Sequence, residues 1–234
     1  PMAGLTNRSE GMIVVPDPNR TDFWLITHQN ASQSYSATKI DATATFPTTT
    51  TSGIGLPMSV ANFSYHPASK KLAVSPQDPN THALIIKFNN TSGVFSHDRT
   101  IFNSATASTS NQSIYDIEWD TKGQYLYLSR NGETGIPANV FQYDYINPSI
   151  SLTSVLGAPV FRSYGLQIAP DSAIYHLYQA ASGGPFLVGK LTNTDTVASE
   201  VINTQSLFAG ANFNGTQFPS FTPKDSVVIS ISFT

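Results

Sequence analysis

The sequence predicts an all-β protein made of four-stranded sheets that are arranged as the blades of a β-propeller. A strand–turn–strand unit recurs about every fifty residues, and no window shows sustained helical periodicity. The units lie at residues 12–27, 60–75, 114–129, 164–178 and 218–232. An all-β repeat of this length is typical of stacked four-stranded blades.

Each unit combines a β-rich run, a turn of Pro, Asp, Gly or Ser, and a second apolar run. The second and third units align without a gap, which places Tyr65 on Trp119. Because their turns align, we expect Pro67–Lys70, Asp120–Gly123 and Pro170–Ser172 to join the innermost strand of a blade to its neighbour.

Apolar runs between the repeated units predict the third and fourth strands of the blades. The predicted blades are residues 10–57, 58–112, 113–162 and 163–214, with a partial fifth blade at 215–234. Propellers of this length form one domain, so we expect residues 1–234 to be a single propeller domain or a fragment of one. Either the ring closes small, or a neighbouring domain or chain completes it, because an open blade exposes an unpaired strand edge.

The composition limits the classes of partner. Charged residues make up 12% of the 234 residues, the net charge is −3, and there is no basic stripe, so we expect no nucleic-acid partner. No apolar run reaches the length of a membrane span, so we expect no membrane insertion. The absence of Cys excludes disulfides, thiolate metal sites and Cys nucleophiles. Abundant Ser and Thr in place of charged residues favour an exported protein.

No motif for catalysis or for a cofactor is present. The five histidines have no metal-ligand spacing, and we expect them to be turn or surface residues; they are His28, His66, His82, His97 and His176. The sequence contains no nucleophile elbow, Walker loop or dinucleotide fingerprint. We therefore expect no catalytic residue, no metal and no cofactor.

One predicted inner strand carries alternating acids. Asp116, Glu118 and Asp120 lie at every second position and so share a face, where they could bind a cation or act as acid and base. Alternatively, Asp120 opens the turn and Glu118 faces a channel or solvent. Ser64 and Gln167 align with Glu118 in two other blades, so polar residues are expected to line a water-filled central channel.

Two tyrosines stand at the same point of two inner strands. Tyr115 and Tyr164 mark the entry to these strands and hence one rim of the channel, where they could stack on a sugar or a peptide. The alternative is that they pack between blades. The candidate ligand-binding residues at the channel rim are Tyr115, Asp116, Glu118, Tyr164 and Gln167.

Several segments carry a family resemblance. Tyr115–Ser129 (YDIEWDTKGQYLYLS), Leu166–Asp171, Asp22–His28 and Phe141–Asp144 resemble runs of WD-repeat-like propellers in large secreted surface proteins of Bacteroidetes. These include gliding-motility-associated proteins and cargo of type IX secretion. The resemblance implies a secreted or cell-surface adhesion, scaffold or display module, and no catalytic residue carries over.

The resemblance also implies possible modification. Asp-Ser/Thr-apolar triplets are O-glycosylation acceptors in Bacteroidetes, and three triplets of this form place the acceptor hydroxyl at Ser172, Thr196 and Ser226. The alternative is that these triplets are ordinary turns.

Together these features predict a non-enzymatic binding, display or adhesion module of an exported bacterial surface protein, located outside the cell or at its surface. Its partner would be a glycan or protein ligand, or a neighbouring domain or chain that completes the propeller. One alternative is a propeller enzyme of lactonase or lyase type, which would need acids or His converging on the channel mouth. A second is a structural subunit of an extracellular assembly.

Overall fold

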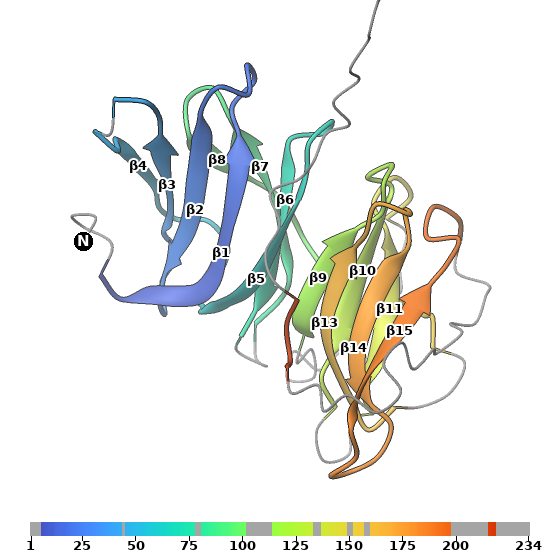
Figure 1. Cartoon of the computed structure of the whole chain (residues 1–234). Helices are drawn as coiled ribbons and strands as arrows, with labels where there is room; N and C mark the ends of the chain where they lie inside the picture. The colour runs from blue at the N-terminus through green and yellow to red at the C-terminus, as the bar shows by residue number, and fades with distance from the viewer. Residues whose placement is uncertain are drawn as a thin grey trace, which may run out of the picture.

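The fold is known from a computed structural model, which describes residues 6–43, 45–77, 81–101, 114–132, 137–148, 152–156, 160–197 and 215–218. These residues contain β-strands and no helix, so no helix in this part of the chain could cross a membrane. The strands form four antiparallel sheets that are the blades of a β-propeller (Figure 1). The all-β propeller prediction is confirmed.

The sheets follow one another along the chain. The first contains β1 (Arg8–Pro16), β2 (Phe23–Gln29), β3 (Tyr35–Ile40) and β4 (Thr48–Thr51). The second contains β5 (Val60–His66), β6 (Lys71–Pro76), β7 (Leu84–Asn89) and β8 (Val94–Thr100). The third contains β9 (Ile114–Trp119), β10 (Tyr125–Arg130), β11 (Asn139–Asp144) and β12 (Thr153–Ser154). The fourth contains β13 (Arg162–Ile168), β14 (Ile174–Gln179) and β15 (Phe186–Leu191).

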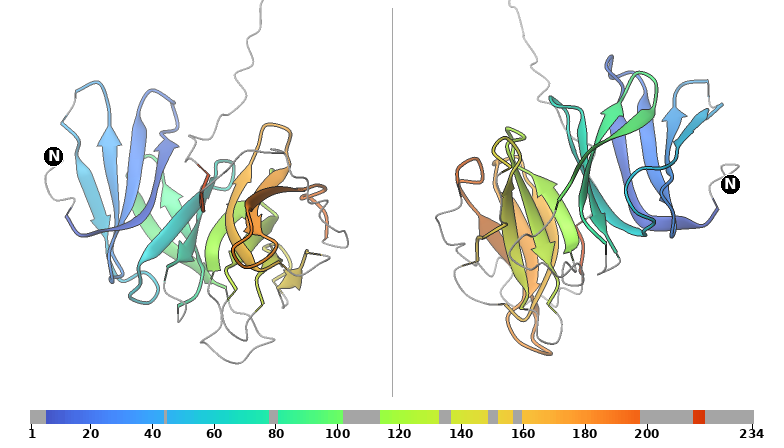
Figure 2. Two further views of the ribbon diagram at one scale, coloured as in Figure 1. Left: turned by 60° about the horizontal axis from the view of Figure 1, so that its bottom comes forward. Right: turned by 180° about the vertical axis from the view of Figure 1, so that it is seen from behind.

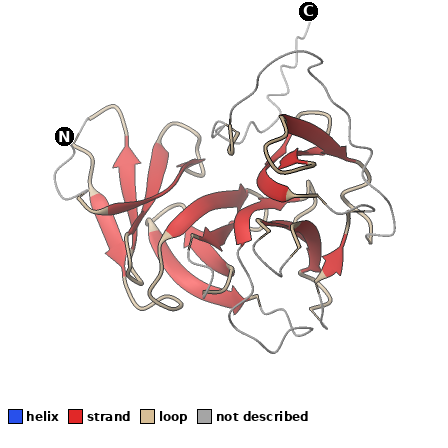
Figure 3. Cartoon of the chain, turned by 90° about the horizontal axis from the view of Figure 1, so that it is seen from below, coloured by secondary structure: helices blue, strands red, loops and turns tan. Residues whose placement is uncertain are grey.

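The first strand of each blade is the innermost. Consecutive innermost strands pack against each other, in the pairs β1–β5, β5–β9 and β9–β13. Within the described part of the chain, β1 and β13 do not form a fourth pair of this kind. The blades therefore stand side by side in an arc, which is seen from below in Figure 3 and from two further sides in Figure 2.

The predicted turns join the innermost strand to the second strand in each blade, as expected. These three turns and the corresponding turn between β1 and β2 share one geometry, in which an N–H bonds to the carbonyl three residues earlier. The donor residue has a positive φ in each case: Arg20 (59°), Lys70 (54°), Gly123 (68°) and Ser172 (65°). Only one of these residues is glycine, so three turns adopt a conformation that is uncommon for side-chain-bearing residues.

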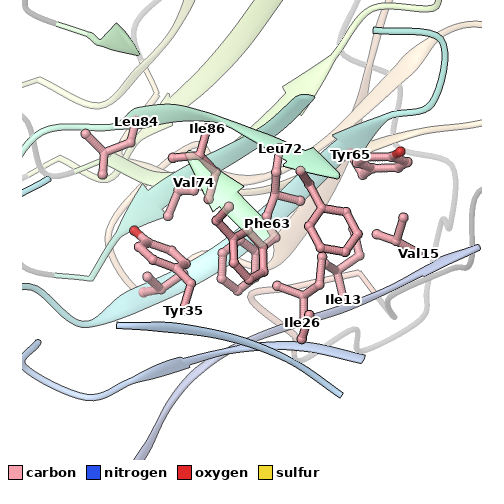
Figure 4. Close-up of a cluster of buried hydrophobic side chains, with 14 of the residues drawn as sticks. Ile13, Val15, Ile26, Tyr35, Phe63, Tyr65, Leu72, Val74, Leu84 and Ile86 are labelled. Atoms are coloured by element: carbon pink, nitrogen blue, oxygen red, sulfur yellow. The ribbon is translucent and has the colours of Figure 1, made fainter. Parts of the chain in front are cut away.

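The core is divided among the spaces between blades. The cluster between the first two blades includes Ile13 and Ile26 of one blade and Phe63, Leu72 and Val74 of the other (Figure 4). A second cluster lies between the second and third blades, and a third between the third and fourth. Each of the first three blades thus buries apolar side chains against the next blade along the chain, which is how propeller blades stabilise one another.

The predicted partial fifth blade lies outside the described residues except for 215–218. This short segment lies beside β13, because the Gly165 N–H donates to the Thr216 carbonyl over 2.9 Å. Gly165 allows this close approach, since a Cβ at this position would lie 3.0 Å from the Thr216 carbonyl oxygen and 3.1 Å from the Gln217 Cα, and the segment would have to shift slightly.

Candidate functional site at the inner strands

The innermost strands of three blades bring the predicted polar residues together. Asp116 and Glu118 are two positions apart on β9, so their side chains point to the same face. This face lies between β5, which carries Ser64, and β13, which carries Gln167. The alignment of Ser64, Glu118 and Gln167 from the sequence therefore corresponds to a real neighbourhood in space.

Asp116 is 1% exposed and accepts hydrogen bonds from both neighbouring blades. Its Oδ1 accepts from Asn62 Nδ2 at 2.6 Å and from the Ile117 N–H at 2.7 Å. Its Oδ2 accepts from the Leu166 N–H of β13 at 2.7 Å. One carboxylate thus joins the second, third and fourth blades.

Glu118 repeats this arrangement one step along the strand and is 8% exposed. Its Oε1 accepts from the Ser64 hydroxyl and from the Trp119 N–H. Its Oε2 accepts from Gln167 Nε2 and from the Ile168 N–H, each at 3.3 Å. We call Asn62, Ser64, Asp116, Glu118 and Gln167 the carboxylate bridge.

The expectation that Ser64 and Glu118 line a water-filled channel is corrected by their burial, at 5% and 8% exposure. Asp116 likewise lies between blades and not on an open rim. The physical reason is that side chains and N–H groups of the adjacent strands supply the hydrogen bonds that water would otherwise make. Ligand binding by these residues stays a prediction.

Burial controls the electrostatics of the bridge. Burial raises the pKa of Asp116 to about 7, although the hydrogen bonds from Leu166, Ile117 and Asn62 act in the opposite direction. Burial also raises the pKa of Glu118 to about 7, and the nearby charge of Asp116 raises it further. The two carboxyl groups therefore change their protonation near neutral pH.

Asp120 does not join the two buried acids. Its Oδ1 accepts from the N–H groups of Gln124 and Tyr125 at 2.9 and 3.0 Å, which closes the turn between β9 and β10. The alternative in which Asp120 opens the turn is confirmed, and the three-acid arrangement is wrong. Among the described residues, no three His, Asp or Glu side chains gather as a possible metal-ion site.

The two predicted tyrosines meet beside the bridge. The ring centroids of Tyr115 and Tyr164 are 5.7 Å apart, with an interplanar angle of 84°. The Tyr115 hydroxyl donates to Thr216 Oγ1 at 2.8 Å, and the Tyr164 hydroxyl donates to Gln179 Oε1 at 2.9 Å. Both rings are half-buried, each is hydrogen-bonded through its hydroxyl, and the two rings contact each other, so they form a rigid aromatic pair.

Sequence reasoning missed several members of this region. Asn62 and the amides of Leu166 and Ile168 complete the bridge, and Thr216 fixes Tyr115. The gapless alignment of the second and third units does place Asn62 opposite Asp116, and this signal could have identified it. No sequence pattern identifies which backbone amides a carboxylate reaches.

Two histidines expected in turns or at the surface are fully buried, which corrects the prediction for them. His176 Nε2 lies 2.7 Å from Ser163 Oγ, which is 2.8 Å from Ser129 Oγ. His28 Nδ1 lies 3.0 Å from Ser9 Oγ. Burial lowers the pKa of His176 to about 3 and that of His28 to about 4, so both rings are neutral near pH 7.

Two of the three predicted glycosylation acceptors follow strands of the fourth blade, Ser172 between β13 and β14 and Thr196 after β15. Ser172 and Thr196 are exposed, and Ser226 lies outside the described residues. Their modification stays a prediction.

Comparison with solved structures supports the propeller architecture. The fold is similar to TolB from Acinetobacter baumannii, with a TM-score of 0.55, 14% identity, and coverage of 90% of this chain and 46% of that chain. It is also similar to hydrazine synthase from Kuenenia stuttgartiensis, with a TM-score of 0.55, 15% identity, and coverage of 89% of this chain and 56% of that chain. The chain thus spans about half the length of the structures it matches. No protein-family model and no curated protein matches the sequence.

Proposed function

We propose that this chain is a non-enzymatic binding or display module of an exported bacterial surface protein, and that it binds a glycan through Tyr115 and Tyr164. The observation that carries the proposal is the rigid aromatic pair at the inner strands, 5.7 Å between centroids. Secretion and a location at the cell surface are part of this proposal and are supported by the Ser- and Thr-rich composition and the resemblance of the repeated segments.

A fixed aromatic pair suits a sugar ligand. The Tyr115 and Tyr164 hydroxyls already donate to Thr216 and Gln179, so what they offer a ligand is mainly ring surface. Aromatic rings that are ordered before binding lose little conformational entropy when a ligand stacks on them. Phe186 packs against Tyr164 with centroids 5.4 Å apart and extends this surface along the fourth blade.

The carboxylate bridge gives this surface a rigid support. Tyr115 is next to Asp116 on β9, and the bridge holds β9 against β13, which carries Tyr164. The relative position of the two rings therefore depends on the bridge. In this proposal Asp116 and Glu118 are positioning residues and do not touch the ligand.

A glycan array followed by titration calorimetry on the best oligosaccharide tests the proposal. We expect Tyr164→Ala to weaken binding at least tenfold, because loss of an aromatic side chain on which a nucleic-acid base stacks costs about 1–3 kcal/mol, and loss of a stacked sugar should be of the same order. Tyr175→Ala is the matched control, since Tyr175 is also a half-buried tyrosine of the fourth blade but lies apart from the pair. Equal losses in both variants, or no binding to any glycan, would contradict the proposal.

The second candidate function is a propeller enzyme of lactonase or lyase type. The observation that favours it is the pair of carboxyl groups with pKa values of about 7, close to the value that suits a general acid or base at neutral pH. Hydrolysis of a gluconolactone, followed by pH-stat, tests it. Turnover that disappears in both Asp116→Asn and Glu118→Gln, while both variants keep the wild-type circular dichroism spectrum, would replace the binding function with this one.

A further inference from the structure

Three cationic side chains lie near Tyr145 and Asp98 at the junction of the second and third blades. The Lys71 ammonium lies 3.5 Å from the centroid of the Tyr145 ring, and the Arg99 guanidinium carbon lies 4.5 Å from it. The Tyr145 hydroxyl donates to Asp98 at 2.8 Å, and the other oxygen of Asp98 pairs with Lys87 at 3.1 Å. We call Lys71, Lys87, Arg99, Asp98 and Tyr145 the Tyr145 cluster.

The strand register places two of these cations opposite each other. Lys71 of β6 pairs directly with Lys87 of β7. Like charges at directly opposed positions of an antiparallel pair destabilise a sheet. Arg99 adds a third cation from β8, and its guanidinium donates to the Tyr143 hydroxyl and the Tyr145 carbonyl, which are neutral acceptors.

The cluster has more positive than negative charge, unlike the other lysine pairs of this molecule. Lys39, Lys122 and Lys190 each pair with one carboxylate, at 2.8, 2.7 and 2.7 Å. In the Tyr145 cluster a single carboxylate, Asp98, faces three cations. Among the described residues, no carboxylate lies within ion-pair distance of Lys71.

The electrostatic effect of this imbalance is seen on Lys71. Burial lowers the pKa of Lys71, the charges of Lys87 and Arg99 lower it further, and only Asp98 raises it. The site is nevertheless accessible, because the Lys87 side chain is 60% exposed and Lys71, Arg99 and Tyr145 are half-buried. A ligand that brings negative charge would relieve the repulsion.

We infer that the Tyr145 cluster binds the anionic group of an acidic glycan, a carboxylate or a sulfate. Lys71 and Arg99 both lie over the Tyr145 ring and Lys87 pairs with Asp98, so three positive charges meet a single negative charge, and an acidic substituent would reduce this imbalance. This inference rests on the proposed glycan-binding function and adds a separate contact for the ligand, because Tyr145 lies beside Gln124 at the β9–β10 turn whereas Tyr115 lies near the other end of β9.

Titration calorimetry with a sulfated heparin octasaccharide, a carboxylated oligogalacturonate and a neutral dextran oligosaccharide tests the inference. We expect at least one acidic probe to bind at low ionic strength, with affinity that falls as salt is added, because salt screens exposed charges. Lys71→Met combined with Lys87→Met should weaken this binding at least tenfold. Asp98→Asn removes the single carboxylate and should strengthen it at least twofold.

Lys190→Met is the matched control, since it removes one lysine charge from the fourth blade and should leave the affinity for the acidic probe unchanged. An equal loss in Lys190→Met and in the double variant would overturn the inference, because it would indicate unspecific attraction. Failure of both acidic probes, or equally tight binding of a poly-glutamate peptide, would also overturn it. A loss of neutral-glycan binding in Tyr164→Ala tests the proposed function separately, because Tyr164 is not part of the Tyr145 cluster.

Discussion

The interface between the first two blades and the interface between the last two are stabilised by different kinds of interaction. The first is built from large apolar side chains, where Phe88 packs against Trp24, Tyr65 and Phe95 with ring centroids 4.9–6.4 Å apart. The last has a smaller apolar cluster, and two buried carboxylates of β9 accept hydrogen bonds from the amides of β13. Neighbouring blades of one molecule are thus joined by apolar packing in one place and by hydrogen bonds to buried carboxylates in another.

The difference has a thermodynamic meaning. Burial of apolar surface stabilises the first interface without regard to protonation, and its strength depends on how well the side chains fill the space. The carboxylate bridge depends on geometry and on the charge of two acids whose pKa values are about 7. The two interfaces should therefore respond to different perturbations.

The largest effect is expected from a cavity in the first interface. Phe88 is 1% exposed, and Phe88→Ala should lower the free energy of unfolding by about 3–5 kcal/mol, because a large void remains in a packed core. Urea unfolding followed by tryptophan fluorescence measures this, since Trp24 lies against Phe88. Leu56→Ala is the control, because Leu56 is 55% exposed and should cost little. If Phe88→Ala and Leu56→Ala lowered the free energy of unfolding by similar amounts, this interface would not be the apolar core of the fold.

A slightly smaller effect is expected from removing an acceptor of the bridge. Asp116→Ala leaves the N–H groups of Ile117 and Leu166 and the amide of Asn62 without their acceptor. Buried donors without partners are costly, so the free energy of unfolding should fall by about 3 kcal/mol. Urea unfolding measures it, with the exposed Glu10→Ala as the control. A cost below about 0.5 kcal/mol would show that the bridge does not hold the blades together.

The pH dependence separates the two interfaces. The folded-state pKa of Asp116 is about 7, and its unfolded value is about 4, so the fold favours the protonated form. Protonated Asp116 therefore makes its full contribution to the free energy of unfolding below about pH 4, and this contribution is lost as the pH rises from about 4 to 7. His28 and His176 have the opposite effect on stability over a similar pH range. Both rings are buried in the neutral form, so their contribution to the free energy of unfolding increases as the pH rises.

Comparison of Asp116→Asn with the wild type removes the contribution of the two histidines, which is equal in both proteins, and reports Asp116 together with its effect on the pKa of Glu118. The stability of Asp116→Asn relative to wild type should rise by about 2 kcal/mol between pH 5 and pH 7. Urea unfolding at both pH values measures the difference. In Phe88→Ala the difference from wild type should stay constant with pH. A flat profile for Asp116→Asn would contradict the link between the bridge and protonation.

The smallest effect on stability is expected from adding a side chain at a glycine with a positive φ. Gly123 and Gly53 both have a positive φ, 68° and 80°. A Cβ on Gly123 would collide with the His66 ring of the second blade, whereas a Cβ on Gly53 would meet nothing within 4 Å. We expect Gly53→Ala to cost about 1 kcal/mol from backbone strain alone and Gly123→Ala about 2 kcal/mol. Thermal unfolding measures both, and equal costs would show that the turn does not contact the next blade closely.

Much of the fold was accessible from the sequence because it repeats. Local patterns of apolar residues and turn residues report on strands that pair with their neighbours along the chain, and the alignment of Ser64, Glu118 and Gln167 carried over directly into the bridge. The turn geometry was less accessible, since Arg20, Lys70 and Ser172 occupy a position where glycine would be the usual signal.

The environment of the candidate site could not be predicted in the same way. Alternation along β9 places Asp116 and Glu118 on one face, but it does not say whether water or another blade covers that face. The burial of both acids depends on the Leu166 and Ile168 amides, whose positions are set by the packing of β13. The same limit applies to His176, whose burial results from contact between blades.

The carboxylate bridge also gives the molecule an internal spectroscopic reporter. The amides of Leu166 and Ile168 donate to carboxylates of a different blade. Their hydrogen–deuterium exchange rates therefore measure how often the third and fourth blades part, while amides bonded within a sheet measure the opening of that sheet. Comparison of the Leu166 and Ile168 amides with amides that bond within the same sheet can thus distinguish motion between blades from unfolding within a blade.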